Sequence, residues 1–532
     1  MKRNLFNILI TLIIGTVLFY MYLPPINLSS IAFWIFVIVL LVIYGMISTI
    51  NNKISYKAIN ANGLNINIPR NAYYIVFSIA AIIIGIILID LVCSPMFTAK
   101  SYSKRITIEE SSDFLKDVSE VDFKSIPLLD RDSSEKLGDR VMGQMSEYVS
   151  QYYVSDQYTQ INYNNDIIRV TPLEYSGFIK WISNRKKGIK AYIMVNSVNG
   201  EANLVKLDKG MRYMPSACFN ESLERKLRFS YPTSIFGTSK FEIDNDGNPY
   251  WITPIYKYTG VSLKTKVVGV VILDPKTGNS KKYELDEIPT WVDNAYNSDL
   301  IIEQVDDWGT YRDGFLNSIF GQKNVVKTTE GYNYLALNDD IYLYTGITSV
   351  LSDESNLGFI LTNMRTGKTT FYPVAGAEEY SAMSSAEGQV QQMNYDSTFP
   401  LLINLNNRPT YLVSLKDAAG LVKMYGFVDV SDYQKVVVTD ASKGIEVAAQ
   451  NYLANFKDEV DESVLDKKTI VVKRITSATK NGDTSFYITD DANQKYIASI
   501  KVSDELPFIS IGDKMSVDCY NANGYLIITK IN

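Results

Sequence analysis

The chain has no histidine among its 532 residues, and this restricts the chemistry that its side chains could perform near neutral pH. Histidine is the usual general base in that range and the commonest metal ligand. A serine nucleophile would therefore need a lysine as its base. Ser442 stands directly before Lys443, which is not the Ser-x-x-Lys spacing that such a pair uses. We predict no catalytic residues and a protein that is not an enzyme.

Three groups of acidic residues could bind a metal ion or move protons. Asp244–Gly247 has the sequence with which a calcium loop begins, but Trp251 opens an apolar stretch where the loop should continue toward its glutamate. Asp306–Asp307 and Asp339–Asp340 are adjacent pairs. Neighbouring side chains point about 100° apart on a helix and to opposite faces of a strand. We interpret the first group as a hairpin turn and the pairs as solvated residues of helix ends or turns, so no metal or cofactor site is predicted.

Three further features have both a chemical and a structural interpretation. Cys93, Cys218 and Cys519 lie far apart in the sequence, and we predict buried or membrane thiols rather than a disulfide or a nucleophile. The basic run Arg185–Lys187 predicts a solvated loop, with a phosphate or lipid-headgroup contact as the alternative. Asp90 lies near the end of an apolar segment, where we expect it to reach water; a functional acid within the membrane is the alternative.

The charge balance excludes one class of partner. The 58 acidic and 52 basic side chains give a net charge of −6. A surface that binds nucleic acid must instead neutralise phosphates with positive charge. The sequence also contains no glycine-rich phosphate loop. We therefore expect no nucleic-acid partner.

Three apolar segments open the chain. Leu5–Leu23, Ile31–Ile50 and Ala72–Val92 each have about the 20 residues that a helix needs to cross a bilayer. No Ala-x-Ala-like cleavage site follows the first segment, so we interpret it as a retained helix and not as a signal peptide. Residues 1–95 are thus predicted to form a domain of three transmembrane helices, with the lipid bilayer as a partner.

Positive charges in the short loops predict the orientation of these helices. Five of them lie on one side of the predicted helices: Lys2, Arg3, Lys53, Lys57 and Arg70. Three follow the last helix on the other side: Lys100, Lys104 and Arg105. Because the cytoplasmic side carries the excess, we predict a multi-pass protein of the cell membrane. Its N-terminus would be cytoplasmic, and the residues after about 94 would be extracytoplasmic.

The region after the membrane helices contains a recurring pattern of a small residue, an apolar strand and a polar turn. The pattern is clearest in Gly269–Gly278 and Gly358–Gly367, and looser in Ala191–Gly200 and Gly426–Lys435. Two further pairs of stretches match in the same order: Ile255–Gly260 with Ile341–Gly346, and Ser234–Gly237 with Ser318–Gly321. The offsets of 89, 86 and 84 residues are nearly equal and indicate tandem repeats.

Each repeat is expected to contain a helix and an antiparallel sheet, which makes the ectodomain an α+β array of tandem modules. Asn, Asp and Gly at the turns suit the positive φ that hairpins need. Helices are predicted at Ser133–Tyr152, Trp291–Trp308 and Glu378–Met393, and a strand at Arg105–Glu109. Residues 96–155 are predicted to form a connecting region of one strand and one amphipathic helix. Four modules are predicted to follow it, at 156–230, 231–315, 316–393 and 394–460.

The last part of the chain, residues 461–532, predicts a small all-β barrel. Phe456–Asp466 is a charged run that we interpret as a linker. Five strand-like runs follow it: Thr469–Thr476, Thr484–Thr489, Lys495–Val502, Lys514–Tyr520 and Tyr525–Ile531. Five short antiparallel strands suit a barrel of the OB type. Capping or protein docking is the plain interpretation of such a barrel here, and an oligonucleotide or oligosaccharide ligand is the alternative.

The turn signature also resembles a known family. A strand ends in Asp274–Gly278 or Asn363–Gly367, and a strand with a tyrosine follows, at Tyr283 or Tyr372. This order is similar to the PepSY family, whose small exported modules lay one helix on an antiparallel sheet. The resemblance implies a membrane-anchored bacterial protein and a link to the restraint of peptidases. Larger blocks are similar to a wider group of three-span bacterial proteins, which lends no catalytic residues: Pro127–Asp130, Leu137–Arg140 and Ala375–Tyr380.

We therefore predict a membrane-anchored extracytoplasmic binding or scaffold protein of the bacterial cell envelope. It would act through protein–protein contacts of its repeats, with other envelope proteins as partners. The alternatives are restraint of an envelope peptidase in the PepSY manner, and binding or processing of an envelope glycan. An enzyme should show a concave pocket with converging titratable groups and perturbed pKa values, whereas a scaffold should show shallow pockets.

Overall fold

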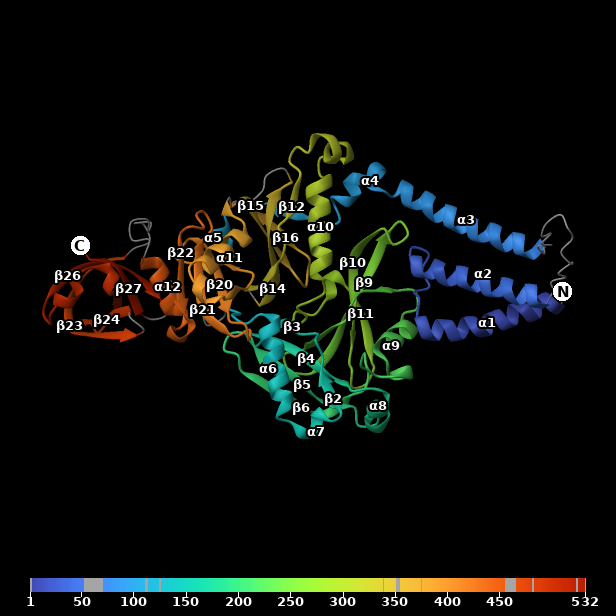
Figure 1. The fold of residues 1–532 in the computed structure, drawn as a ribbon, viewed down its shortest axis with the longest axis horizontal. Coiled ribbons are helices and arrows are strands. Elements are labelled where there is room, and N and C mark those ends of the chain that lie inside the picture. Colours follow the sequence, from blue (N-terminus) through green and yellow to red (C-terminus); the bar gives the residue numbers. More distant parts are fainter. Residues whose placement is uncertain are drawn as a thin grey trace.

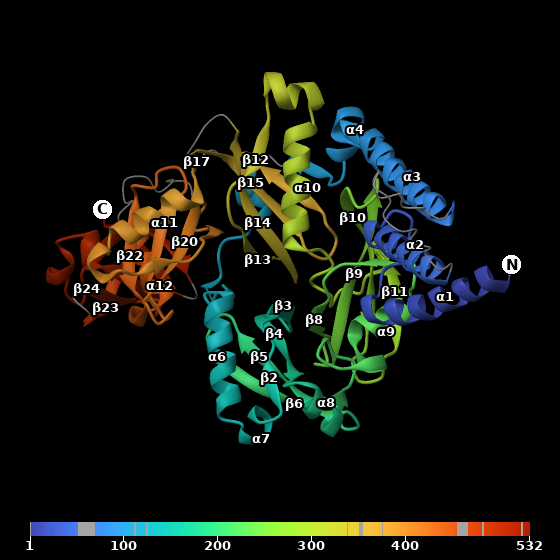
Figure 2. The same cartoon turned by 45° about the vertical axis from the view of Figure 1, so that its right-hand side comes forward.

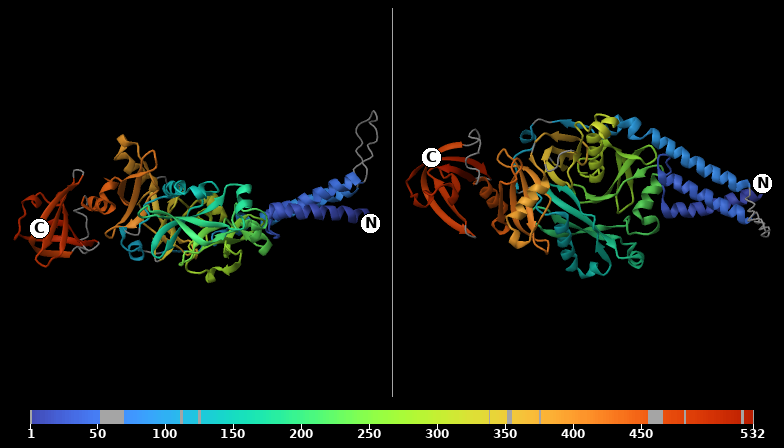
Figure 3. Two further views of the ribbon diagram at one scale, coloured as in Figure 1. Left: turned by 90° about the horizontal axis from the view of Figure 1, so that it is seen from below. Right: turned by 45° about the horizontal axis from the view of Figure 1, so that its top comes forward.

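The computed structural model describes residues 2–51, 70–110, 113–123, 126–337, 339–350, 355–374, 376–454, 466–480, 483–522 and 525–531. The loop with Lys53 and Lys57 and nearly all of the predicted linker lie outside these residues. Three apolar helices lie at one end of the molecule, four sheets with flanking helices form the middle, and a closed barrel lies at the other end (Figure 1). Figure 3 shows the same order from two further sides.

The first part consists of α1 (Lys2–Tyr22), α2 (Ile31–Asn51) and α3 (Arg70–Val92). All three are long and apolar enough to cross a membrane. Large apolar side chains such as Leu5 and Phe77 are 70% and 74% exposed, as contact with lipid tails allows. The prediction of three apolar N-terminal helices is confirmed.

Four sheets make up the middle of the chain, and their strands have the same order. A first strand, split into two short pieces, pairs with a long second strand, the second pairs with a third, and the third pairs with a fourth. The first sheet contains β2 (Tyr152–Val154), β3 (Thr159–Tyr163), β4 (Asp166–Tyr175), β5 (Ile189–Asn196) and β6 (Ala202–Met211). The second contains β7 (Ile235–Phe236), β8 (Lys240–Ile243), β9 (Pro249–Thr259), β10 (Lys264–Leu273) and β11 (Ser280–Glu284).

The third sheet contains β12 (Val326–Thr328), β13 (Asn333–Leu337), β14 (Asp340–Ser349), β15 (Ser355–Asn363) and β16 (Thr369–Tyr372). Two short strands extend it, β1 (Ile108–Glu110) on β16 and β17 (Gly376–Ala377) on β15. The fourth contains β18 (Asp396–Ser397), β19 (Leu401–Asn404), β20 (Pro409–Lys416), β21 (Val422–Asp429) and β22 (Val436–Asp440). The first sheet begins inside the predicted connecting region 96–155, because β2 already pairs with β4.

One helix precedes each sheet, and one follows the last: α6 (Arg131–Gly143), α9 (Leu223–Ser230), α10 (Ser298–Tyr311), α11 (Glu379–Gly388) and α12 (Ile445–Ala454). The predicted helix Ser133–Tyr152 is wrong beyond Gly143, where a separate turn, α7 (Ser146–Val149), leads into β2. The predicted start at Trp291 is also wrong. The Asn297 side chain accepts a hydrogen bond from the Asp299 amide (3.1 Å), and this N-cap starts α10 at Ser298.

The four stretches with the recurring sequence pattern form β5, β10, β15 and β21, the third strand of each sheet. Where each of these strands ends, an Asn or Asp side chain accepts a hydrogen bond from the amide two residues on: Asn196, Asp274, Asn363 and Asp429. Such bonds stabilise the turn locally. Gly278 completes one turn with a φ of +75°, and a Cβ there would come within 2.4 Å of the Tyr213 ring. Only glycine suits that position.

The four sheets form a ring, which Figure 2 shows with the first sheet below, the second at the right, the third above and the fourth at the left. The ring closes between the fourth sheet and α6. Lys416 of β20 forms an ion pair with Asp130, and Lys136 of α6 donates a hydrogen bond to the Ala419 carbonyl (2.7 Å). The helix α6 then packs on β5 and β6 of the first sheet.

Five strands close into a barrel at the C-terminal end: β23 (Asp466–Lys480), β24 (Asp483–Asp490), β25 (Lys495–Ser499), β26 (Lys514–Ala522) and β27 (Tyr525–Ile531). Tyr520 and Ile527 of the barrel belong to the same apolar core as the fourth sheet, so the barrel is packed on its neighbour. The prediction of a five-stranded barrel is confirmed.

Two predictions for charged residues in and after α3 need correction. Asp90 accepts a hydrogen bond from the Val261 amide (2.7 Å) between β9 and β10, so the expectation that it merely reaches water is wrong. Arg105 precedes β1 instead of starting a strand, and it is 8% exposed. Its guanidinium pairs with Glu303 (3.2 Å) and with Asp307, both in α10. A buried ion cluster therefore ties the segment after α3 to the helix that precedes the third sheet.

Candidate functional site

A cavity of about 780 Å³ lies at the centre of the ring of sheets, and all four sheets contribute to its lining. One backbone position recurs in this lining. In each sheet, the second piece of the first strand pairs with the long second strand, and the recurring position lies three residues before the end of that pairing. In the order of the sheets this residue is Gln160, Lys240, Tyr334 and Leu401. The four sheets thus present different side chains from one equivalent position, and the site belongs to the ring as a whole.

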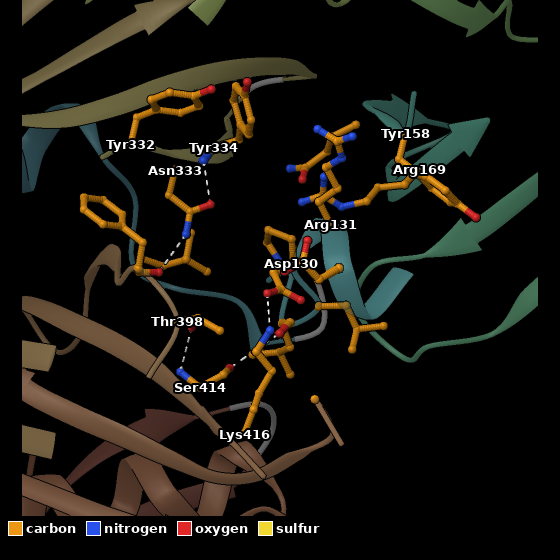
Figure 4. Close-up of a pocket in the computed structure, with 18 of the residues that line it drawn as sticks. Asp130, Arg131, Tyr158, Arg169, Tyr332, Asn333, Tyr334, Thr398, Ser414 and Lys416 are labelled. Atoms are coloured by element: carbon orange, nitrogen blue, oxygen red, sulfur yellow. Dashed lines mark hydrogen bonds and ion pairs between the residues drawn. The ribbon is translucent and has the colours of Figure 1, made fainter. Parts of the chain in front are cut away.

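Arg169 is a buried cation in this cavity. It lies on β4 opposite Gln160 and is 6% exposed. Figure 4 shows its side chain reaching from β4 into the pocket. Among the residues that the structure describes, no carboxylate forms an ion pair with its guanidinium, and its Nε has no hydrogen-bond partner. Burial lowers the pKa of Arg169 to about 10, so the side chain remains cationic at neutral pH.

Lys240 and Arg131 add two further cations to the lining. Lys240 is half-buried, and no ion pair to it occurs within the described ranges. Burial lowers the pKa of Lys240, and the charge of Arg131 lowers it further. The Arg131 side chain donates one hydrogen bond to the Asp156 carbonyl (2.7 Å) and is otherwise exposed. The charge of Arg131 lowers the pKa of both Lys240 and Arg169, and all three side chains line the same cavity.

The acidic residues of the lining offset this positive charge only in part, since none of them forms an ion pair with Arg169 or Lys240 within the described residues. Asp130 is already paired with Lys416, and Asp417 with Lys423 (3.4 Å). Asp132, Asp299 and Asp396 are exposed, so water screens them. The buried part of the cavity is therefore positive, although the lining as a whole contains both signs of charge.

Neutral polar groups without partners lie beside Arg169. The Gln160 amide nitrogen and the Thr159 hydroxyl are buried, and neither has a hydrogen-bond partner in the described part of the chain. Buried polar groups of this kind are uncommon in folded proteins. The Tyr334 hydroxyl contacts the Ser298 hydroxyl, and burial raises its pKa, so it stays neutral. A carboxylate, phosphate or sulfate next to Arg169 would satisfy the unpaired donors and the guanidinium together.

A buried carboxyl pair supports the wall of the cavity from behind. Glu242, two residues after Lys240, accepts hydrogen bonds from the amides of Asp293 and Asn294 (2.9 Å each). The Asn294 side chain donates to the Gln160 carbonyl (2.9 Å). Burial raises the pKa of Glu242, and burial with repulsion from Glu242 raises the pKa of Asp293. These bonds join the second sheet to the first and hold Gln160 at the cavity.

The acidic candidates from the sequence lie elsewhere, and two of the three interpretations need correction. Asp244 accepts hydrogen bonds from the Asp246 and Asn248 amides (3.0 and 2.8 Å), which makes Asp244–Gly247 part of a hairpin turn. The expectation that Asp306–Asp307 is solvated is wrong. Asp306 accepts two bonds from Thr328, and Asp307 joins the buried cluster with Arg105.

The prediction that Asp339 and Asp340 are both solvated turn residues is correct for Asp339 and wrong for Asp340. Asp339 lies in the turn with a φ of +69°. Asp340 is buried, and both of its carboxylate oxygens accept hydrogen bonds from Arg365 (2.8 and 2.7 Å). No group of three or more Cys, Asp or Glu within the described residues has the spacing to hold a metal ion.

The remaining sequence candidates lie outside the cavity. Cys93, Cys218 and Cys519 are free thiols, of which Cys519 is buried and the other two partly buried. Arg185–Lys187 is exposed, and Ser442 follows Asp440, whose carboxylate accepts a hydrogen bond from the Ser442 amide (2.8 Å).

The sequence contains one signal that points to the cavity. Arg169 interrupts the apolar run Ile167–Val170, whose other residues are all buried. A cation in a strand that is apolar on both faces must find a partner or accept a large desolvation cost. Lys240, directly before the buried Phe241, is a weaker form of the same signal.

Comparisons with known proteins identify no family for this chain. No family model matches the chain, and no curated protein matches it. Among solved structures, a crystal structure of an ACO/RPE65 chimera aligns at 8% sequence identity with a TM-score of 0.13. The alignment covers 71% of this chain and 63% of that one, which is less than two thirds of its length. A similarity this low supports no conclusion about fold or activity.

Proposed function

We propose that the protein is a membrane-anchored binding protein of the bacterial cell envelope, and that its ectodomain takes a ligand with an anionic group into the central cavity. The observation that carries this proposal is Arg169, a cation that is 6% exposed and unpaired among the described residues of the cavity. Leaving a charge buried without a partner costs several kcal/mol. A bound anion would offset that cost, and binding sites commonly retain such locally unfavourable residues.

The geometry favours a protein that binds a ligand in its cavity over a scaffold that acts only through flat protein contacts. A volume of about 780 Å³ falls within the range of about 300–1,000 Å³ that small-molecule sites have. Titratable groups with shifted pKa values converge on it. The proposal is binding and not turnover, because the lining has no histidine and no unpaired buried carboxylate to act as a base. The anionic group would enter toward Arg169 and Gln160.

Binding of small anions to the full-length protein in lipid nanodiscs tests this proposal. Glucuronic acid, citrate and pyrophosphate serve as probes, and glucose is the uncharged match for glucuronic acid. We expect at least one anion to raise the unfolding temperature in a saturable way, and glucose to have no effect. Affinity should fall as the pH rises toward the usual lysine value of about 10.4, because burial lowers the pKa of Lys240 below its usual value and lowers the pKa of Arg169 to about 10. Equal effects of glucose and glucuronic acid, or no effect of any anion, would contradict the proposal.

The orientation of the protein is part of the same proposal. It is supported by the excess of positive charge at the N-terminal end of α1 and in the loop before α3. The pairing of Arg105 with Asp307 strengthens it, since one of the three cations that follow α3 is neutralised and buried. The ectodomain would then lie outside the cytoplasm.

Labelling of single cysteines in intact cells checks this orientation. Asn60→Cys and Lys281→Cys are introduced separately into a chain without its three native cysteines, and a membrane-impermeant maleimide is added from outside. The Lys281→Cys variant should react in intact cells, because Lys281 is exposed on the second sheet. The Asn60→Cys variant should react only after lysis. The reverse pattern would place the ectodomain in the cytoplasm.

We further propose that the four sheets are tandem copies of one module and that the barrel is of the OB type. The shared strand order and the four equivalent Asn or Asp turns support the first idea. The barrel order β23-β24-β25-β27-β26, with β25 and β27 parallel, supports the second. A helix before each antiparallel sheet is compatible with PepSY-like modules, and restraint of an envelope peptidase is the alternative function.

A further inference from the structure

A short helix beside the first sheet, α8 (Phe178–Asn184), exposes apolar side chains on one face, and Trp181 is its one buried residue. Phe178, Ile179 and Ile182 are 52%, 73% and 49% exposed. Trp181 is 1% exposed and donates a hydrogen bond to the Glu221 carboxylate (3.2 Å), which fixes the orientation of the helix. Soluble surfaces rarely gather large apolar side chains in this way without a partner.

The apolar face is continuous with the junction between the ectodomain and α1. The Phe219 ring lies 6.3 Å from the Phe178 ring, and Phe219 is 56% exposed. Next to it, Asn220 accepts a hydrogen bond from the Tyr20 hydroxyl (3.2 Å) at the end of α1. Arg225 stacks over the Tyr20 ring at 4.2 Å and donates to the Phe219 carbonyl (2.5 Å). Figure 1 shows α8 and α9 on the side of the ectodomain that faces the membrane helices.

Positive charge borders the same face. Arg185–Lys187 follows α8 directly and is exposed, and Arg185 lies 5.2 Å from the centre of the Trp181 ring. Lys180 lies within the helix. An apolar face with basic residues at its border is the composition of a helix that binds the surface of an anionic membrane.

We propose that α8, together with Phe219 and Arg185–Lys187, is a second membrane contact of the ectodomain. Phe178, Ile179 and Ile182 would enter the bilayer at the level of the outer end of α1, while the basic run contacts anionic headgroups. The contact fixes the tilt of the ring of sheets relative to the membrane. It depends on α1 crossing the bilayer and is independent of any ligand in the central cavity.

A spin label on α8 tests this contact in the full-length protein. Ile179→Cys carries the label in a chain whose native cysteines are replaced. The matched control is Ile511→Cys, because Ile511 is also exposed (70%) but lies in the barrel at the far end of the molecule. Nanodiscs are made of phosphatidylcholine alone or with about a third of anionic phosphatidylglycerol. Accessibility to oxygen, which concentrates in lipid, is compared with accessibility to a water-soluble nickel complex.

We expect the label at 179 to favour oxygen several-fold in the anionic nanodiscs, and the label at 511 to favour nickel in both. Replacing Arg185, Lys186 and Lys187 with glutamine should reduce the oxygen preference at 179 to the level seen in phosphatidylcholine. A label at 179 that is as accessible to nickel as the label at 511 would overturn the proposal. Equal insertion in both lipids would overturn the role of the basic run.

Discussion

Replacing Arg169 with methionine is expected to stabilise the protein and to abolish anion binding at the same time. Methionine has a similar length and no charge, so the variant removes a buried cation that has no partner in the described structure. Exchange of buried charges for apolar residues of similar volume is often stabilising by about 1–4 kcal/mol. Loss of a charge-assisted bidentate contact should weaken anion binding by roughly 100-fold.

Both effects can be measured on one preparation in nanodiscs. Denaturant titration followed by tryptophan fluorescence reports the free energy of unfolding, since Trp181 and Trp251 are fully buried in the folded state. Calorimetry with the tightest anionic probe reports binding. The matched control is Arg474→Met, which removes an exposed arginine of the barrel outside the cavity and should leave anion binding unchanged. A destabilised Arg169→Met variant that still binds the probe would show that Arg169 has a purely structural role.

The second large effect is expected at Arg105. Replacing it with methionine should destabilise the protein by about 3–5 kcal/mol, because a buried ion pair is broken from one side. Asp307 is 6% exposed, and Lys264 (3.2 Å) would be its one remaining cationic partner among the described residues. The variant would also loosen the connection between the segment after α3 and β10, since Arg105 additionally donates to the Thr265 carbonyl (2.5 Å).

A double variant separates this explanation from a loss of packing. Arg105→Met with Asp307→Leu removes both buried charges and leaves the pair between Lys264 and Glu303 (2.6 Å) intact. It should recover most of the lost stability in denaturant titration. Lys116→Met is the matched control, because it removes an exposed cation paired with Asp113 and should leave the unfolding midpoint unchanged. No recovery in the double variant would mean that the ion cluster is not the source of the loss.

The outer parts of the fold could be predicted from the sequence because local composition determines them. An uncharged run as long as Ile31–Ile50 has few alternatives to a membrane helix. The barrel strands follow from alternating apolar residues between clear turns, and each predicted run lies within or overlaps an observed strand. Helix ends were less predictable. The pattern at Ser133–Tyr152 continues past Gly143, but α6 ends there and the last residue of the pattern, Tyr152, pairs with β4 in the first sheet.

The cavity could not be predicted because its lining comes from segments between Pro127 and Gly420 that meet only when the ring closes. The prediction that Asp307 is solvated is wrong for the same reason, because it considered only the adjacent residue in the sequence. Adjacent acids do point apart on α10, as predicted, yet burial of one of them depends on Arg105 and Lys264 from distant segments. The cavity also uses the pattern that the four sheets share. Gln160, Lys240, Tyr334 and Leu401 occupy one position of that pattern.

The most direct measurement of the central claim is a cryo-electron microscopy map of the full-length protein with the tightest anionic probe. The account predicts new density in the central cavity, with the anionic group within about 3 Å of the Arg169 guanidinium and beside the Gln160 amide. The same map of the Arg169→Met variant should lack this density. A probe bound elsewhere on the protein, with the cavity unchanged, would contradict the account.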